Sequence, residues 1–368
     1  MLKDIRVIDF SQYLPGPFAT LRLTELGAEV IKVESPDGDP GRYPLQADGS
    51  PRITFLANNR NKKSVVLNLK EEADQLSALE LIREADVVIE SFRPGVMKRL
   101  GIDYENVMKI NPSVVYCSLS GYGQKGCMHQ LGSHDINYMA LSGLLAQMKD
   151  DQGKPIQPSM TFADLIGGIS ANESILAALV HREKTGKGAY LDISITDAAT
   201  TLMTNHVIVE SSTGEQHGLS KIHKKHVCYF IYETKDNRFI SLGALEPKFW
   251  NNFCMALNKP EWINTHFSAP TADNPVFLEI QELFLSRTFE EWTKFSLEVD
   301  CCMAPILETG EVWQHPYIKE RGLVQEKEGL RVAATRYIED GSSLDTYSPA
   351  PKHGEHQKEI SILQEHHR

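Results

Sequence analysis

Residues 5–34, IRVIDFSQYLPGPFATLRLTELGAEVIKVE, contain the pattern that decides the fold of this 368-residue chain. The pattern at 5–10 predicts a short buried strand, an amphipathic segment at 18–26 predicts a helix, and the pattern at 28–34 predicts a second strand. Gly27 follows the helical segment, at the position where glycine commonly ends a helix. Strand, helix and strand within so short a stretch predict a right-handed βαβ unit and therefore a parallel sheet.

The same alternation continues through the N-terminal half of the chain. Further strand patterns occur at 65–69, 86–90 and 113–119, and a helical pattern at 71–84 separates the first two. The loop after the first strand contains Pro15-Gly16-Pro17 instead of G-x-G-x-x-G, which disfavours a nicotinamide dehydrogenase. We therefore expect an α/β fold with a parallel sheet and without a dinucleotide site.

The composition changes near 211–226, where Ser, Gly, Gln, His and Lys are frequent, and the pattern then shifts to short strands and amphipathic helices. We predict a large domain at 1–215, a smaller α+β domain at 216–315, and a C-terminal segment at 316–368 that returns to the large domain. The loop at 36–51 is rich in Asp, Gly and Pro, and we expect a mobile flap there. The tail past Ser348 is expected to be loosely held.

The composition disfavours several classes of protein. A net charge of −11 argues against nucleic acid as a partner, because binding its backbone requires clustered Lys and Arg. No apolar run reaches the roughly 18 residues that span a bilayer, and the N-terminus lacks the apolar core of a signal peptide. The six cysteines show no C-x-x-C pair and no zinc spacing, so we expect reduced thiols and no metal site. We expect a cytoplasmic protein without membrane contact.

Two segments contain candidate catalytic side chains. In 132–138 (GSHDINY), His134 stands beside an aspartate, and further along Asp164 precedes a pair of glycines and a helical run at 169–179. Asp164 thus lies where a helix is expected to begin, and the N–H groups and positive dipole there would hold its carboxylate ionised and directed at a ligand. Taken alone, the local pattern fits an ordinary N-cap and a core histidine better.

Basic residues lie near the ends of several expected strands, and open α/β sheets bind ligands at the carboxyl ends of their strands. Either they form an ordinary solvated set, or three basic loops on an acidic protein hold a phosphate-rich ligand. The residues concerned are Arg60, Lys62, Lys63, Arg93 and Arg99.

Taken together, the motifs resemble those of the family III coenzyme A transferases and the related alpha-methylacyl-CoA racemases. The resemblance covers nearly the whole chain, and its motifs keep their order. It implies an interlocked homodimer, in which each chain threads through the other, and a Rossmann-like domain built from the N-terminal half and the C-terminal tail. The matching segments are Asp9-Phe10 with Pro15-Gly16-Pro17, residues 26–34, Phe92 to Val96, Gly132 to Tyr138, Ala163-Asp164 with Gly167-Gly168, and Glu311-Val312 with His315-Pro316.

Two chemistries within this family use the same carboxylate. In the transferases, the residue that matches Asp164 is a nucleophile that passes through anhydride and CoA-thioester stages. In the racemases, Asp164 and His134 would be the two bases that flank the α-carbon of a 2-methylacyl-CoA, with Glu246 supporting the histidine. All three racemase positions are filled, His134 and Asp164 are 30 residues apart as the resemblance requires, and 218–226 lacks the glycine run of the transferases. The resemblance therefore favours a racemase over a transferase.

The resemblance implies an acyl-CoA substrate and no permanently bound cofactor, since coenzyme A enters as part of the substrate. Ser35 replaces an arginine of the racemases, so the 3′-phosphate contact would pass to Lys32, Lys62 or Lys63. A non-catalytic acyl-CoA-binding protein is a third possibility, but it has no need for the three catalytic positions together. The residues expected to line the coenzyme A path are Arg60, Leu69, Ser91, Phe92, Arg93, Arg99 and Tyr138.

Overall fold

The structure is a computed structural model that describes residues 1–44, 52–150, 152–217, 225–327, 329–333, 338–339, 342–343 and 347–359. The chain forms two compact units, which are Met1–Thr204 with Gly322–Arg368, and Asn205–Arg321. We call them unit 1 and unit 2. Their limits, at 204 and 321, differ by 11 and 6 residues from the limits we predicted at 215 and 315. Part of the predicted boundary, 218–224, lies outside the described residues.

Unit 1 contains a six-stranded sheet in which every neighbouring pair is parallel. The strand order is β3-β2-β1-β4-β5-β6, the order of a Rossmann sheet. The predicted parallel α/β sheet is therefore confirmed, although its third strand begins two residues earlier than 65. The strands are β1 Arg6–Asp9, β2 Glu29–Glu34, β3 Lys63–Val66, β4 Val87–Glu90, β5 Val115–Ser120 and β6 Ala189–Ser194.

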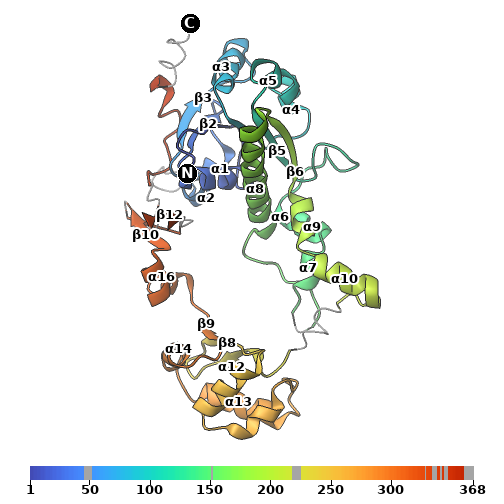
Figure 1. The fold of residues 1–368 in the computed structure, drawn as a ribbon, viewed down its shortest axis with the longest axis vertical. Helices are drawn as coiled ribbons and strands as arrows, with labels where there is room; N and C mark the ends of the chain where they lie inside the picture. Colours follow the sequence, from blue (N-terminus) through green and yellow to red (C-terminus); the bar gives the residue numbers. More distant parts are fainter. Residues whose placement is uncertain are drawn as a thin grey trace. The chain divides into compact units, whose positions relative to one another are not determined.

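Helices cover both faces of this sheet because successive strand residues point to opposite sides. Val7 belongs to the core beneath α1 and α8, whereas its neighbour Ile8 belongs to the core that contains residues of α3, α4 and α5. Figure 1 shows α1 and α8 side by side, in agreement with their extensive packing. The helices are α1 Pro15–Glu25, η1 Pro40–Arg42, α2 Ile53–Asn58, α3 Glu72–Arg83, α4 Val96–Arg99, α5 Tyr104–Ile110, α6 Asp135–Leu141, α7 Leu144–Gln147, α8 Phe162–Thr185 and α9 Ile195–Thr201.

Helix α8 differs from the prediction in two respects. It begins at Phe162 and not after Gly168, so the glycine pair lies inside the helix. Within the described residues it is also the one helix long and apolar enough to cross a membrane by length and composition, which our reading of the sequence missed. Core helices of globular proteins pass the same test, and α8 packs against α1, α9 and the sheet.

Residues 347–359 of the C-terminal segment lie on unit 1 and are held more firmly than we predicted, whereas 360–368 lie outside the described residues. After the hairpin of β10 (Val324–Lys327) and β11 (Leu330–Ala333) and the short strands β12 (Ile338–Glu339) and β13 (Ser342–Ser343), the chain runs along the free edge of β3. There the N–H of His356 donates to the carbonyl of Ser64 at 3.0 Å, and Val66 N–H donates to Gln357 at 2.8 Å. These bonds satisfy an edge strand that would otherwise be open to pairing.

Unit 2 consists of helix α10 (Thr204–Thr213), which begins at the junction, and an antiparallel sheet β7-β8-β9 packed on helices. Three buried tryptophans, Trp250, Trp262 and Trp292, dominate its core. The remaining elements are β7 Tyr229–Glu233, β8 Phe239–Gly243, α12 Pro247–Ala256, η2 Pro260–Thr265, α13 Pro275–Leu285, α14 Phe289–Glu298, β9 Met303–Pro305, α15 Thr309–Val312 and α16 Pro316–Arg321.

Candidate active site

Asp164 is the third residue of α8, so the interpretation of this residue as a simple N-cap is wrong. The N-cap is Thr161, whose side chain makes no capping hydrogen bond. The backbone N–H of Asp164 donates to Asp135 Oδ1 at 3.0 Å, so α6 supplies the cap for α8. One turn further on, a methyl group at Gly168 would lie 2.6 Å from the carbonyl oxygen of Pro15. The glycine thus lets the start of α1 approach α8 beside Asp164.

The protonation of Asp164 differs from our expectation. Its side chain is half-buried, and burial together with the negative charge of Asp135 raises the pKa of its carboxyl from 3.8 to about 7. The helix N-terminus therefore does not keep Asp164 fully ionised at neutral pH, because desolvation outweighs it. A carboxyl with a pKa near 7 both accepts and donates protons under physiological conditions, as a general acid or base must.

His134 is the N-cap of α6, and its side chain is exposed. Its backbone N–H donates to Asn137 Oδ1 at 3.0 Å, which fixes the entry into the helix. The interpretation of His134 as a satisfied core histidine is therefore wrong. His134 is the residue directly before Asp135, whose carboxylate accepts the backbone N–H of Asp164.

Tyr138 is buried and braces the loop that carries His134. Its hydroxyl donates to the carbonyl of Ser133 at 3.0 Å, and its ring packs edge-on against Tyr122. A methyl group at Gly121 would lie 2.5 Å from the Tyr138 ring, so the glycine makes room for it. Burial raises the pKa of Tyr138, and the charge of Asp164 adds to this effect. The phenol therefore stays protonated and serves as a hydrogen-bond donor.

The turn after β4 reaches the same loop. Ser91 Oγ accepts the N–H of Gln12 at 2.9 Å, and the N–H of Phe92 donates to Glu90 at 2.8 Å. The exposed guanidinium of Arg93 lies against Gly132, where a methyl group would be 2.7 Å from Nη2. Arg99 is also exposed, whereas Phe92 and Leu69 pack on the core. Among the predicted coenzyme A residues, Arg93 therefore lies beside the His134 loop.

The other basic residues behave differently, because protein carboxylates already pair with them. Arg60 is buried and contacts Glu25 at 3.3 Å, and Lys63 contacts Glu29 at 2.9 Å. Lys32 and Lys62 are fully buried and therefore cannot reach a 3′-phosphate from these positions. The other interpretation, that these are ordinary solvated basic residues, is therefore also wrong for Lys32 and Lys62.

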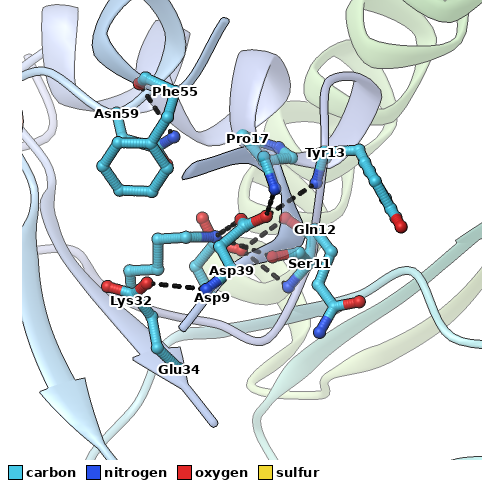
Figure 2. A network of polar contacts seen from close by, with 12 residues as sticks. Asp9, Ser11, Gln12, Tyr13, Pro17, Lys32, Glu34, Asp39, Phe55 and Asn59 are labelled. Carbon is cyan, nitrogen blue, oxygen red and sulfur yellow. Dashed lines mark hydrogen bonds and ion pairs between the residues drawn. The ribbon is translucent and has the colours of Figure 1, made fainter. Parts of the chain in front are cut away.

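Lys32, within β2, and Lys62, just before β3, belong to a buried ionic network beside the carboxyl end of β1, which sequence reasoning missed. Figure 2 shows Asp9, Lys32 and Asp39 of this network. Lys32 contacts Asp39 at 2.7 Å, and Lys62 contacts Asp9 at 3.1 Å. Glu34 accepts two hydrogen bonds from Arg42, each 2.7 Å long. The sequence feature that could have indicated this network is the pair of opposite charges, Asp9 and Lys32, within two successive strand patterns. The predicted mobile flap is wrong for 36–44, which this network holds, and 45–51 lies outside the described residues.

Glu246 lies in unit 2, where it is the exposed N-cap of α12 without a side-chain capping bond. Its support of His134 stays a prediction. All six cysteines are free thiols. In the ranges that the structure describes, no group of three or more His, Cys, Asp or Glu side chains is arranged to hold a metal ion.

Known proteins with related sequences include enzymes of both chemistries. The chain is 33% identical to the acetyl-CoA:oxalate CoA-transferase of Acetobacter aceti over 334 residues, which are 88% of this chain and 85% of that protein. It is 30% identical to the human alpha-methylacyl-CoA racemase over 366 residues, or 98% and 92% of the two chains. A CAIB/BAIF family protein from Brucella suis has a similar structure, with a TM-score of 0.86, 25% identity and 98% of each chain covered. The sequence profile of CoA-transferase family III matches residues 2–357, and the chain belongs to this family of acyl-CoA enzymes.

Proposed function

We propose that this enzyme is an acyl-CoA racemase that inverts C2 of 2-methylacyl-CoA thioesters by proton transfer between His134 and Asp164. The observation that carries the proposal is the half-buried position of Asp164 in the first turn of α8, against Asp135 and thus beside the residue that follows His134. Burial and Asp135 raise the pKa of this carboxyl to about 7, which supports the proposal. A group that removes a proton in one direction and returns it in the other needs a pKa near the working pH. His134 is exposed and bears an imidazole, the side chain that acts most often as a general acid or base.

In this mechanism one group removes the α-proton from one face of the thioester, and the other group delivers a proton to the opposite face. The intermediate enolate oxygen requires preorganised donors. The backbone N–H groups of Phe162 and Ala163, in the first turn of α8, are suited to this role, since the N–H of Asp164 is taken by Asp135. Glu246 would stabilise the imidazolium form of His134. Arg93 would hold a phosphate of coenzyme A.

The alternative is a family III CoA-transferase that moves coenzyme A between an acyl-CoA and a carboxylic acid through a thioester on Asp164. Similar identity to the Acetobacter aceti transferase and to the human racemase supports keeping it as a candidate. The two reactions differ in what they need from the site. A nucleophilic carboxylate acts without a second base, whereas inversion requires His134 as well.

The experiment is solvent-deuterium exchange with (R)- and (S)-2-methylacyl-CoA, combined with hydroxylamine trapping and mass spectrometry. We expect exchange of the α-hydrogen from both enantiomers and no adduct on Asp164. His134→Ala and Asp164→Ala should each abolish racemisation, with a loss of about 10²-fold or more. His181→Ala, at the far end of α8, is the matched control and should exchange at the wild-type rate. Full activity of His134→Ala, or an Asp164 adduct when a free acid is supplied, would establish the transferase.

We further propose that the enzyme is an obligate, interlocked homodimer. The face of the β7-β8-β9 sheet opposite the helices exposes Tyr229, Ile231 and Phe239 by 45–56%. Helix α10 exposes Val207 and Ile208 by nearly 60% and buries none of its residues within the described chain. Apolar surfaces of this kind are commonly covered by a partner.

Light scattering should therefore give twice the 41.3 kDa subunit mass at micromolar concentration. Ile231→Asp places a charge on the exposed sheet face and should shift the mass toward that of a monomer. Leu297→Asp, on an equally exposed position of α14, should leave the mass unchanged. An active wild-type monomer would refute the dimer.

A further inference from the structure

Tyr13 has a backbone conformation that tyrosine rarely adopts, with φ at 64° in the left-handed region. It lies in the loop between β1 and α1, and its side chain is 54% exposed. A tyrosine in this conformation persists only where the surrounding structure holds it, and such residues are concentrated at functional sites. An exposed ring gains little from burial in unit 1, so packing within the unit does not explain the conformation.

Hydrogen bonds to the backbone on both sides hold the Tyr13 loop. Asp39 accepts the N–H of Tyr13 at 3.2 Å, and Lys32 donates to the carbonyl of Ser11 at 2.7 Å. The N–H of Gln12 donates to Ser91 at 2.9 Å, which ties the loop to the turn after β4. The loop is therefore fixed at three successive residues.

The donors and acceptors beneath the loop are the buried ionic network of Figure 2. Lys32 and Asp39 are at most 1% exposed, and Lys62 and Asp9 are fully buried. Buried ion pairs are weak evidence for stability, because apolar residues of the same size often serve as well. These charged groups instead fix the orientation of the loop, because each one also forms a hydrogen bond with the backbone at 11–13 or at the start of α1. Figure 2 shows the Tyr13 side chain pointing away from the network.

The loop belongs to a closed ring of contacts around the candidate active site. On one side it continues into Pro15, whose carbonyl meets Gly168 one helical turn from Asp164. On the other side it bonds Ser91, and two residues later Arg93 lies against Gly132 at the start of the His134 loop. Tyr13 therefore stands at the carboxyl edge of the sheet, between the turn after β4 and the start of α8.

We propose that Tyr13 contacts the acyl group of the substrate and determines acyl specificity. The inference rests on the proposed acyl-CoA function, and it holds for a racemase and a transferase alike. The aromatic ring of Tyr13 presents an apolar surface, and the strained, hydrogen-bonded backbone of this residue fixes the position of that surface. The buried network beneath it would then be a device that positions a specificity residue.

The test is calorimetric binding of 2-methylpropanoyl-CoA, 2-methyldecanoyl-CoA and free coenzyme A to wild type and to Tyr13→Gly. Glycine suits a φ of 64°, so the melting temperature should not fall. We expect acyl-CoA affinity to fall about tenfold, with a changed preference between the two chain lengths and no change for free coenzyme A. Tyr13→Phe, which keeps the ring, should rescue most of the loss. Asn258→Gly, at another left-handed position in unit 2, is the control for the backbone change.

Unchanged acyl-CoA binding in Tyr13→Gly would overturn the proposal, and so would an equal loss for free coenzyme A, which would place Tyr13 on the nucleotide. Neither result would contradict the proposed function, because the wild-type protein would still bind acyl-CoA. Failure of the wild-type protein to bind any of the three ligands would instead remove the proposed function, and with it this role.

Discussion

Replacing Asp164 with asparagine should inactivate the enzyme and at the same time stabilise it. The folded protein holds this carboxyl in a half-buried position close to Asp135, which raises its pKa from 3.8 to about 7. A folded-state pKa above the unfolded value means that the ionised form is disfavoured by folding. The cost is fully present above pH 7 and is relieved as the pH falls through 7 toward 3.8. Asparagine has the same shape and carries no charge, so the cost disappears.

The size of the effect follows from the shift. A shift of about 3 pKa units corresponds to about 4 kcal/mol, at 1.36 kcal/mol per unit. Because the side chain is only half-buried, solvent screening reduces this, and we expect Asp164→Asn to raise the free energy of unfolding by about 2–4 kcal/mol at pH 8.5. The gain should shrink by about 2 kcal/mol between pH 8.5 and pH 5.5, since the wild-type carboxyl takes up its proton over that interval.

The assay is urea unfolding followed by circular dichroism at both pH values. Asp197→Asn is the matched control, because Asp197 is also the third residue of a helix, α9, but is exposed. That control should lose up to about 1 kcal/mol, as the helix dipole loses a favourable charge. An Asp164→Asn variant that is less stable than wild type, or equally stabilised at both pH values, would show that Asp164 is not held in a desolvated, repulsive environment.

Two further predictions concern the scaffold. Arg42→Met leaves Glu34 buried without its cation, so the free energy of unfolding should fall by about 3–5 kcal/mol; a loss below about 1 kcal/mol in urea unfolding would contradict the buried pair. Gly188→Ala would place a methyl group 2.1 Å from the carbonyl oxygen of Val114 and should lower the melting temperature by several degrees, whereas Gly310→Ala, with open space around it, should not. An unchanged melting temperature for Gly188→Ala would mean that β6 does not approach β5 so closely.

The parallel sheet was predictable because 5–10 and 28–34 are short segments rich in Val and Ile, and an amphipathic helical segment lies between them. The continuation of α8 through its glycine pair was not predictable on the same basis. Gly167 and Gly168 resemble a helix break in the sequence, yet they lie inside the helix because neighbouring elements approach closely there. Local helix propensity depends only on residues that are close in sequence. It therefore cannot predict that the carbonyl of Pro15, which is distant in sequence, packs against Gly168.

The candidate catalytic residues could be identified from their motifs, but their environments could not. Whether a lysine is solvated or buried depends on which carboxylates the fold brings to it. Lys32 and Lys62 were therefore expected near phosphate and are found in ion pairs. The contact between Asp135 and Asp164 spans 29 residues of sequence, and the raised pKa arises from that contact and from burial.

A comparison of two aspartates shows why the neighbours, and not burial alone, separate a structural carboxylate from a reactive one. Asp9 is more deeply buried than Asp164, and burial alone would raise the pKa of both. Lys62 and Lys32 face Asp9 and lower its pKa to about 2, against that effect, so it remains an ionised partner at any physiological pH. Asp164 faces a second carboxylate, and its pKa rises to about 7. Only Asp164 can therefore exchange a proton with a substrate near neutral pH, which is the property that the proposed racemisation requires.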